Sequence, residues 1–259
     1  MSKKRLFTFG CSHTYYHWPT WANILSLGFD DFYNFGQAGT GDFRILNQVM
    51  RANERFKFNQ NDYIGIGMSC NHRYDTISPL GNSWLGLGSM VDEKYHKVNF
   101  IRELNDFGGN ENKLTIVKSI KKLLNDTDTN YKIFKGFKQE NSKNPIEESK
   151  KVYDELAEEC DIKPSLFDYS HPYGRRNTYK IDNIWDGHYI IPVHLDLVKG
   201  EFGDWYDTKN DSVVWDWHKQ MPKDADSIQK MFHWLKFKQY CMVGSELRNP
   251  QYDGTNTII

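Results

Sequence analysis

The sequence lacks the features that would mark a membrane protein or a nucleic-acid-binding protein. No apolar run approaches the roughly 18 residues of a membrane-spanning helix. Lysine plus arginine (33) nearly balances aspartate plus glutamate (34), so the formal net charge is −1 and no basic excess favours a nucleic-acid partner. We therefore expect neither a membrane nor a nucleic acid among the partners of this chain.

Cysteine is also scarce. The four residues, Cys11, Cys70, Cys160 and Cys241, are far apart, and none belongs to a CxxC pair, so their spacing predicts no zinc site. Scattered cysteines and the lack of an N-terminal signal peptide predict synthesis in a reducing cytoplasm. No motif in the sequence calls for a cofactor.

Linker-like segments rich in proline, glycine or serine are missing, and the chain has no internal repeat. A chain of 259 residues is long enough for one α/β domain with a full core. We therefore predict a single domain over residues 1–259, with long loop insertions at about 75–111 and 170–215. In both insertions aromatic and polar residues alternate without a clear period.

What the sequence does contain is an alternation of strand-like and helix-like segments. Apolar runs alternate with amphipathic stretches from the N-terminus onward, and the run at 62–68 is apolar enough to be buried on both faces of a sheet. This βαβαβ order predicts an α/β fold with a central parallel sheet. The strands are predicted at 6–9, 31–35, 62–68, 131–137 and 163–169, and the helices at 18–27, 42–55 (capped by Asp42), 112–125, 144–160 and 222–240.

Polar residues follow the first three predicted strands. Ser12 comes directly after the first strand, in the tripeptide GCS, on a turn that leads toward a helix. A hydroxyl there is exposed at the carboxyl end of a parallel strand, near backbone N–H groups that can stabilise an oxyanion. The stretches NFGQAGTGD (34–42) and SCN (69–71) follow the next two strands. Ser12 is therefore a candidate nucleophile.

In this order the three stretches, with Asp/His pairs near the C-terminus, resemble the SGNH (GDSL-type) hydrolases, a family of esterases and deacylases. GCSHT followed by WPTWA and NxGxxGxGD looks most like the SGNH-like proteins encoded by tailed bacteriophages. The resemblance covers about the first 75 residues. It implies a flavodoxin-like three-layer sandwich, with Ser12 as nucleophile and with the Ser12 N–H, Gly39 and Asn71 as the oxyanion donors.

Two residues beside Ser12 depart from the family pattern or need a separate interpretation. Cys11 stands where the family has aspartate, and we interpret it as a small buried side chain rather than a nucleophile. His13 follows the serine immediately, and adjacent side chains at a strand end diverge. We therefore expect His13 to contact substrate or solvent rather than act as the base.

The resemblance places the base and its orienting acid on a loop just before the last helix. The candidate pairs, ranked by location, are Asp216 with His218, Asp186 with His188, and Asp168 with His171. The first pair precedes the predicted terminal helix, the second matches a DxH string followed by proline, and the third reproduces DxxHP. A metal site built from these histidines and His194 is a weaker reading, because they lack compact ligand spacing.

The expected function is that of a serine esterase or deacylase without a cofactor, acting on an acyl group such as acetyl on a carbohydrate or on another ester. Aromatic residues make up 15% of the chain, including eight Trp, and their rings suit stacking on sugars. The alternative is a catalytically inert SGNH-fold protein with a structural or receptor-binding role in a phage virion. In that case its partners are other virion or tail proteins. Cys11 and the irregular Asp/His pairs motivate this alternative.

Overall fold

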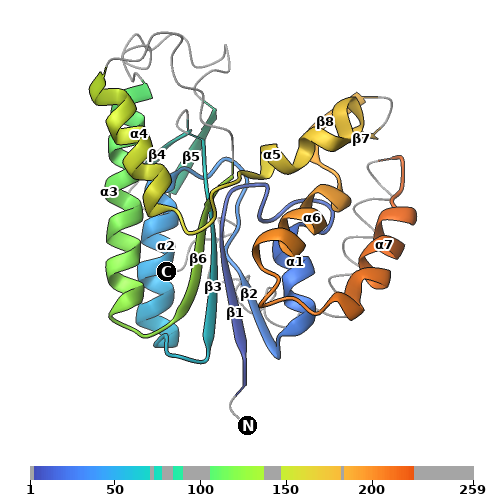
Figure 1. Ribbon diagram of the computed structural model, residues 1–259, viewed down its shortest axis with the longest axis horizontal. Coiled ribbons are helices and arrows are strands. Elements are labelled where there is room, and N and C mark those ends of the chain that lie inside the picture. Colours follow the sequence, from blue (N-terminus) through green and yellow to red (C-terminus); the bar gives the residue numbers. More distant parts are fainter. Residues whose placement is uncertain are drawn as a thin grey trace.

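The computed structural model describes residues 3–70, 73–77, 84–89, 106–136, 147–181 and 184–224. Its centre is a parallel four-stranded sheet between two layers of helices (Figure 1), which confirms the predicted α/β class and three-layer arrangement. Counted along the chain, the parallel strands stand in the flavodoxin-like order 2-1-3-4. In the sheet they are β2 (Asp31–Asn34), β1 (Arg5–Gly10), β3 (Asp62–Met68) and β6 (Asn130–Lys135).

Helices cover both faces of this sheet (Figure 1). One face carries α2 (Asp42–Phe56), α3 (Asp106–Asn125) and α4 (Glu147–Glu159). The other carries α1 (Trp21–Leu25), α6 (Ile191–Glu201) and α7 (Asp211–Lys219), with the short α5 (Leu166–Ser170) near its upper end. Three 3-10 turns span Ser26–Gly28, His171–Arg176 and Thr208–Asn210. Within the described ranges, no helix has the length and apolar character to cross a membrane.

The core lies on both faces of the sheet because successive side chains of a strand point to opposite sides. In β1, Leu6 packs with the cluster of α1 and α6, whereas Phe7 and Phe9 pack with that of α2 and α3. Ile64 and Ile66 of β3 join the second cluster and are 0% exposed. The continuous apolar run at 62–68 is therefore a central strand, as predicted.

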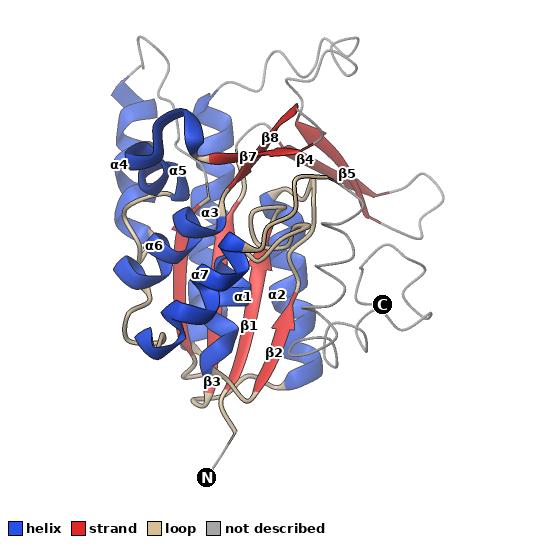
Figure 2. Ribbon diagram, turned by 90° about the vertical axis from the view of Figure 1, so that its right-hand side faces the viewer, coloured by secondary structure: helices blue, strands red, loops and turns tan. Residues whose placement is uncertain are grey.

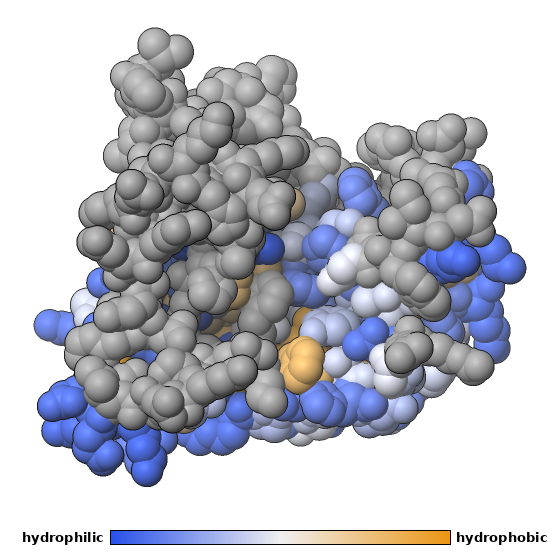
Figure 3. Space-filling model, turned by 90° about the horizontal axis from the view of Figure 1, so that it is seen from above, coloured by the Kyte–Doolittle hydropathy of each residue, from blue (hydrophilic) through white to orange (hydrophobic). Residues whose placement is uncertain are grey.

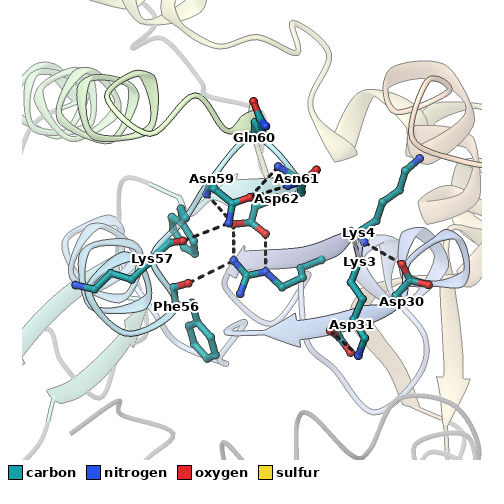
Figure 4. A network of polar contacts seen from close by, with 12 residues as sticks. Lys3, Lys4, Asp30, Asp31, Phe56, Lys57, Asn59, Gln60, Asn61 and Asp62 are labelled. Atoms are coloured by element: carbon teal, nitrogen blue, oxygen red, sulfur yellow. Dashed lines mark hydrogen bonds and ion pairs between the residues drawn. The ribbon is translucent and has the colours of Figure 1, made fainter. Parts of the chain in front are cut away.

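The amino ends of β1 and β3 are joined by a closed ionic network (Figure 4). Arg5 Nε and Nη2 donate to the two carboxylate oxygens of Asp62 at 2.6 and 2.7 Å. Asn59 N–H donates to the same carboxylate at 2.8 Å, and Arg5 Nη2 also reaches the Phe56 carbonyl at 3.3 Å. The hydrogen bond to Asp62 raises the pKa of Arg5. This bidentate pair holds the two central strands together at their start.

The regions predicted as insertions contain regular structure. Strands β4 (Arg73–Ile77) and β5 (Trp84–Ser89) form one antiparallel hairpin, and β7 (Thr178–Ile181) and β8 (Ile184–Tyr189) form another. Both hairpins lie beyond the carboxyl ends of the sheet (Figures 1 and 2). α3 begins at Asp106 instead of 112.

Helix α6 also falls within the predicted insertion at 170–215, but it belongs to a main helix layer. Its sequence shows no clear helical period because seven of its residues are buried nearly all round the helix. The single domain over residues 1–259 stays a prediction, since the described ranges cover only part of it. The helix expected at 222–240 lies outside the described residues from 225 on.

The strand predicted at 163–169 is wrong. Only a bridge between Phe134 and Ile162 extends the sheet there, and a helix follows at once. Asp168 Oδ2 accepts hydrogen bonds from the Ser165 N–H and hydroxyl, both at 2.7 Å, which forms a capping box at the start of α5. The Ser-x-x-Asp spacing is a helix-start signal, and the segment forms a helix although its apolar run favoured a strand.

Candidate active site

Two of the three predicted loops meet at the carboxyl edge of the sheet; Figure 3 views the molecule from this side. Gly10, at the end of β1, pairs with Gly67 of β3. The Gln37 N–H donates to the Gly10 carbonyl at 3.0 Å, so the loop that carries Gly39 lies against the end of β1, two residues from Ser12. Asn71 lies outside the described residues, and its role as oxyanion donor stays a prediction.

Ser12 sits in a tight turn directly after β1. The N–H groups of Thr14 and Tyr15 both donate to the Cys11 carbonyl, at 2.9 and 3.3 Å. Ser12 is 3% exposed, and Cys11 is 1% exposed. Burial raises the pKa of the Cys11 thiol, so it stays protonated and serves as the small buried side chain that we predicted.

Helix α1 begins at Trp21, three residues later than predicted, because Thr20 is its N-cap. The Thr20 hydroxyl donates to the Thr14 carbonyl at 2.7 Å. The start of the helix is therefore tied back to the turn that carries Ser12.

Gly39 has a backbone φ of +78°, in the left-handed region that favours glycine. The Thr40 N–H donates to the Gln37 carbonyl at 3.3 Å, so the loop is a closed turn. A glycine here leaves the backbone N–H accessible, as an oxyanion donor requires. The conformation fits the predicted role of Gly39, and that role stays a prediction.

His13 is buried, so the expected contact with solvent is wrong, whereas its contact with a substrate stays a prediction. It is 5% exposed, and its ring centroid lies 5.0 Å from that of His188 and 5.2 Å from that of Tyr189. Burial, together with His188, His194 and Arg73, holds the pKa of His13 well below its usual range. Strand β8 and helix α6 fold over the Ser12 turn, which no local feature of the sequence indicates.

Of the three candidate bases, His188 is the one that the structure brings against this turn. Its ring stacks on Tyr16 with 3.5 Å between centroids and 20° between planes, and it faces His13 as well. His188 is half-buried, so its imidazole is partly open to solvent. Asp186 lies on the same strand β8, but its side chain is outside the described residues.

His218, ranked first from the sequence, lies within helix α7, so the predicted loop is wrong. Its Nδ1 is 2.8 Å from the Tyr179 hydroxyl, and burial lowers its pKa. Asp216 pairs instead with Lys219 at 3.4 Å. Residues two apart on a helix do not face each other, so Asp216 is not placed to orient His218.

Asp168 and His171 have contacts of a structural kind. The Asp168 carboxylate belongs to the capping box of α5, and the exposed His171 packs edge-on against Phe167 at 4.8 Å between centroids. Their DxxHP string is therefore the start of a helix and the 3-10 turn after it.

Two residues to which the sequence assigned no such role interact with the backbone directly after His188. The Trp18 indole N–H donates to the Tyr189 carbonyl at 2.9 Å. The Tyr189 backbone also raises the pKa of His194, against the larger effect of burial. Burial lowers the pKa of His194 to about 3, so this imidazole stays neutral. Trp18 stands in the WPTWA stretch, but a bond across 171 residues has no local sequence signature.

A buried ion pair lies at the start of α2, beside the Gly39 loop. Asp42 Oδ1 accepts the Ser69 N–H at 2.6 Å, and its Oδ2 lies 3.2 Å from Lys113 Nζ, which also donates to the Ser69 carbonyl. The N-cap of α2 is Gly41, so Asp42 does not cap the helix as predicted. Burial raises the pKa of Asp42, although Lys113 opposes this shift.

Metal binding has no support in the described geometry. Among the residues that the structure describes, no three His, Cys, Asp or Glu side chains are grouped so that they could hold a metal ion. The histidines near Ser12 instead contact one another and neighbouring aromatic rings.

No protein-family model and no curated protein sequence matches this chain. Among solved structures, it is similar to protein YXIM from Bacillus subtilis, with 14% identity over 67% of this chain and a TM-score of 0.37. It spans 46% of the length of that protein.

Two further similar structures are of GDSL-type proteins. A GDSL-like lipase from Bacteroides thetaiotaomicron is 12% identical over 78% of this chain and 86% of its own, with a TM-score of 0.41. A member of the lipolytic protein G-D-S-L family from Veillonella parvula is 13% identical over 75% and 96%, with a TM-score of 0.43. At sequence identities this low, the similarity concerns the fold alone.

Proposed function

We propose that this protein is a serine ester hydrolase of the SGNH type that removes an acyl group, such as acetyl, from a carbohydrate. Ser12 is the nucleophile, His188 the base and Asp186 its orienting acid. The observation that carries the proposal is the position of His188, whose ring rests on Tyr16 and His13 of the Ser12 turn. This contact favours the second-ranked pair of the sequence over the first.

In this mechanism His188 takes the hydroxyl proton of Ser12 as Oγ attacks the acyl carbon. The carbonyl oxygen becomes an anion, which the N–H groups of Ser12 and Gly39 and the side-chain amide of Asn71 stabilise. Collapse breaks the bond to the sugar oxygen, which leaves with the proton from His188. Water, deprotonated by His188, then hydrolyses the acyl-serine. Loss of one oxyanion donor costs about 10²–10³ in rate.

The carbohydrate part of the proposal is supported by the aromatic side chains around His188. Tyr16, Trp18 and Tyr189 gather within one cluster of ring contacts beside the Ser12 turn. Tyr16 and Tyr189 are only half-buried. Partly exposed aromatic rings with a polar tip combine apolar contact area with a hydrogen-bonding group, as a sugar face requires.

Turnover of an acetyl ester tests this proposal. We expect wild-type protein to hydrolyse p-nitrophenyl acetate and to release acetate from an acetylated oligosaccharide. Ser12→Ala should lower kcat/KM by at least about 10³-fold while the far-ultraviolet spectrum and Tm stay unchanged. A folded Ser12→Ala variant with wild-type turnover would contradict the mechanism.

One observation favours the inert alternative, a structural or receptor-binding protein of a phage virion. Ser12 is only 3% exposed, so the residue offers little surface to a substrate. Under this alternative, wild-type protein binds glycans in calorimetry but releases no acetate from any of them.

A further inference from the structure

We infer that Asp75 is a positioning residue that holds the Gly39 loop against strand β4. This inference rests on the proposed function, in which the Gly39 loop supplies an oxyanion donor. Asp75 lies on β4, which Figure 1 shows above the upper end of α2.

The Asp75 carboxylate caps helix α2 from a distant part of the chain. Its Oδ1 accepts the Gly41 N–H at 2.8 Å, and its Oδ2 accepts the Arg44 N–H at 2.9 Å. These are the N–H groups of the N-cap and of the third helical residue, which a local capping box would otherwise satisfy. Gly41 has no side chain to do so.

The approach of the two segments is too close for any residue except glycine at position 41. A Cβ on Gly41 would lie 2.7 Å from Asp75 Oδ2 and 2.9 Å from the Arg73 carbonyl oxygen. Gly41 follows Gly39 by two residues. The carboxylate therefore contacts the backbone of the same loop that presents the proposed oxyanion donor.

A second contact ties the end of β3 to the same helix start. The Ser69 N–H donates to Asp42, and Lys113 bonds both Asp42 and the Ser69 carbonyl. Ser69 and Asp75 are thus both attached to residues 41–44. The arrangement is a clamp made of Asp42, Asp75 and Lys113.

A helix cap alone does not require this arrangement. In a helix without this contact, serine, aspartate or asparagine at the N-cap would cap α2 locally, with no need for a half-buried carboxylate from strand β4. Burial of Asp75 raises its pKa, a penalty that the two backbone hydrogen bonds oppose. What the long-range cap adds is a fixed position for the Gly39 loop, and a misplacement of about 1 Å at such a site lowers rates by about 10²-fold.

Asp75→Ala and Asp75→Asn test this role, with Asp161→Ala as the matched control. Asp161 also accepts a distant backbone N–H, that of Ile133 at 2.9 Å on the edge strand β6. We expect Asp75→Ala to lower kcat by about 10²-fold with KM unchanged. Asp75→Asn, which keeps one acceptor oxygen, should fall between wild type and Asp75→Ala, and Asp161→Ala should keep wild-type kcat.

Amide hydrogen exchange gives a readout that does not depend on turnover. In Asp75→Ala, peptides covering 37–45 should exchange at least about tenfold faster, while peptides of β1 and β3 stay protected. Unchanged exchange at 37–45, or a loss of Tm equal to that of Asp161→Ala with wild-type kcat, would overturn the positioning role. Inactive wild-type protein would instead overturn the proposed function, so the two failures are distinguishable.

Discussion

The two edges of the central sheet both bury charged groups, but they do so in different ways. At the amino edge, Asp62 is 0% exposed and bound by two of the three guanidinium nitrogens of Arg5 (Figure 4). At the carboxyl edge, burial raises the pKa of Asp42 and Asp75 and lowers that of His13 and His194. At the amino edge, the buried carboxylate is paired with an arginine. At the carboxyl edge, burial disfavours the charged forms of several ionisable side chains.

This difference separates a structural region from a candidate site. Perturbed pKa values gather where several titratable groups are desolvated together, and active sites are the commonest places of that kind. A network that only joins strands does not require several titratable groups to be desolvated together. Arg5 and Asp62 join two strands with a single ion pair. The comparison therefore predicts that variants at the amino edge change stability alone, whereas reactivity changes only with variants at the carboxyl edge.

The largest expected effect is on turnover, at the base. His188→Ala should lower kcat/KM for an acetyl ester by about 10³-fold, because a positioned general base contributes about 10²–10⁴. His218→Ala should leave kcat/KM within about threefold of wild type, since a remote histidine makes no such contribution. Equal losses in the two variants would remove the distinction between these histidines.

At the amino edge, Arg5→Ala should lower the free energy of unfolding by about 3 kcal/mol, because it leaves Asp62 buried without its partner. Urea denaturation measures this loss. Turnover per folded molecule should stay at the wild-type level. A variant that loses activity without losing stability would show that the two edges are coupled.

Acid should destabilise the carboxyl edge through His194. Its pKa is about 3 in the folded protein against an ordinary 6.5, so the folded state binds the proton less tightly. The contribution of neutral His194 to the free energy of unfolding is therefore complete above pH 6.5 and falls as the pH drops toward 3.

Through His194 alone, the free energy of unfolding should fall by about 2 kcal/mol between pH 8 and pH 5. Urea titrations at the two pH values measure the difference. His194→Gln, which keeps an N–H donor but does not titrate, should show a smaller one. An identical pH dependence in wild type and His194→Gln would contradict the assignment.

The smallest expected effect on stability is that of Gly39→Ala. A side chain at a φ of +78° should cost about 1 kcal/mol, measured as a shift in urea midpoint. Ester turnover should fall further than this loss of stability explains, because the loop also supplies an oxyanion donor. Wild-type turnover in Gly39→Ala would show that the loop conformation does not matter to the reaction.

Segments with a strong local period were predicted well from the sequence. β1, β2, β3 and β6 and the helix α2 lie within a few residues of the expected ranges. The order of the GCS and NFGQAGTGD stretches placed Ser12 and Gly39 at one edge of the sheet. These elements are specified by their own apolar alternation, so no distant contact was needed to find them.

The base was harder to predict, because short Asp/His strings recur in a chain with nine histidines. Asp216 and His218 stand in a helix, and the DxxHP string contains a capping box. What distinguishes His188 is the return of β8 onto the Ser12 turn, which depends on tertiary packing. Asp75 was missed for the same reason, since its partners lie 31 and 34 residues away.

Reaction with an organophosphonate probe, followed by intact mass and peptide mapping, tests the central claim most directly. The account predicts one adduct at Ser12 in wild-type protein that disappears in His188→Ala but persists in His218→Ala and His171→Ala. Labelling that survives in His188→Ala and is lost in His218→Ala would contradict the assigned base. The absence of any adduct on folded wild-type protein would contradict the activated serine itself.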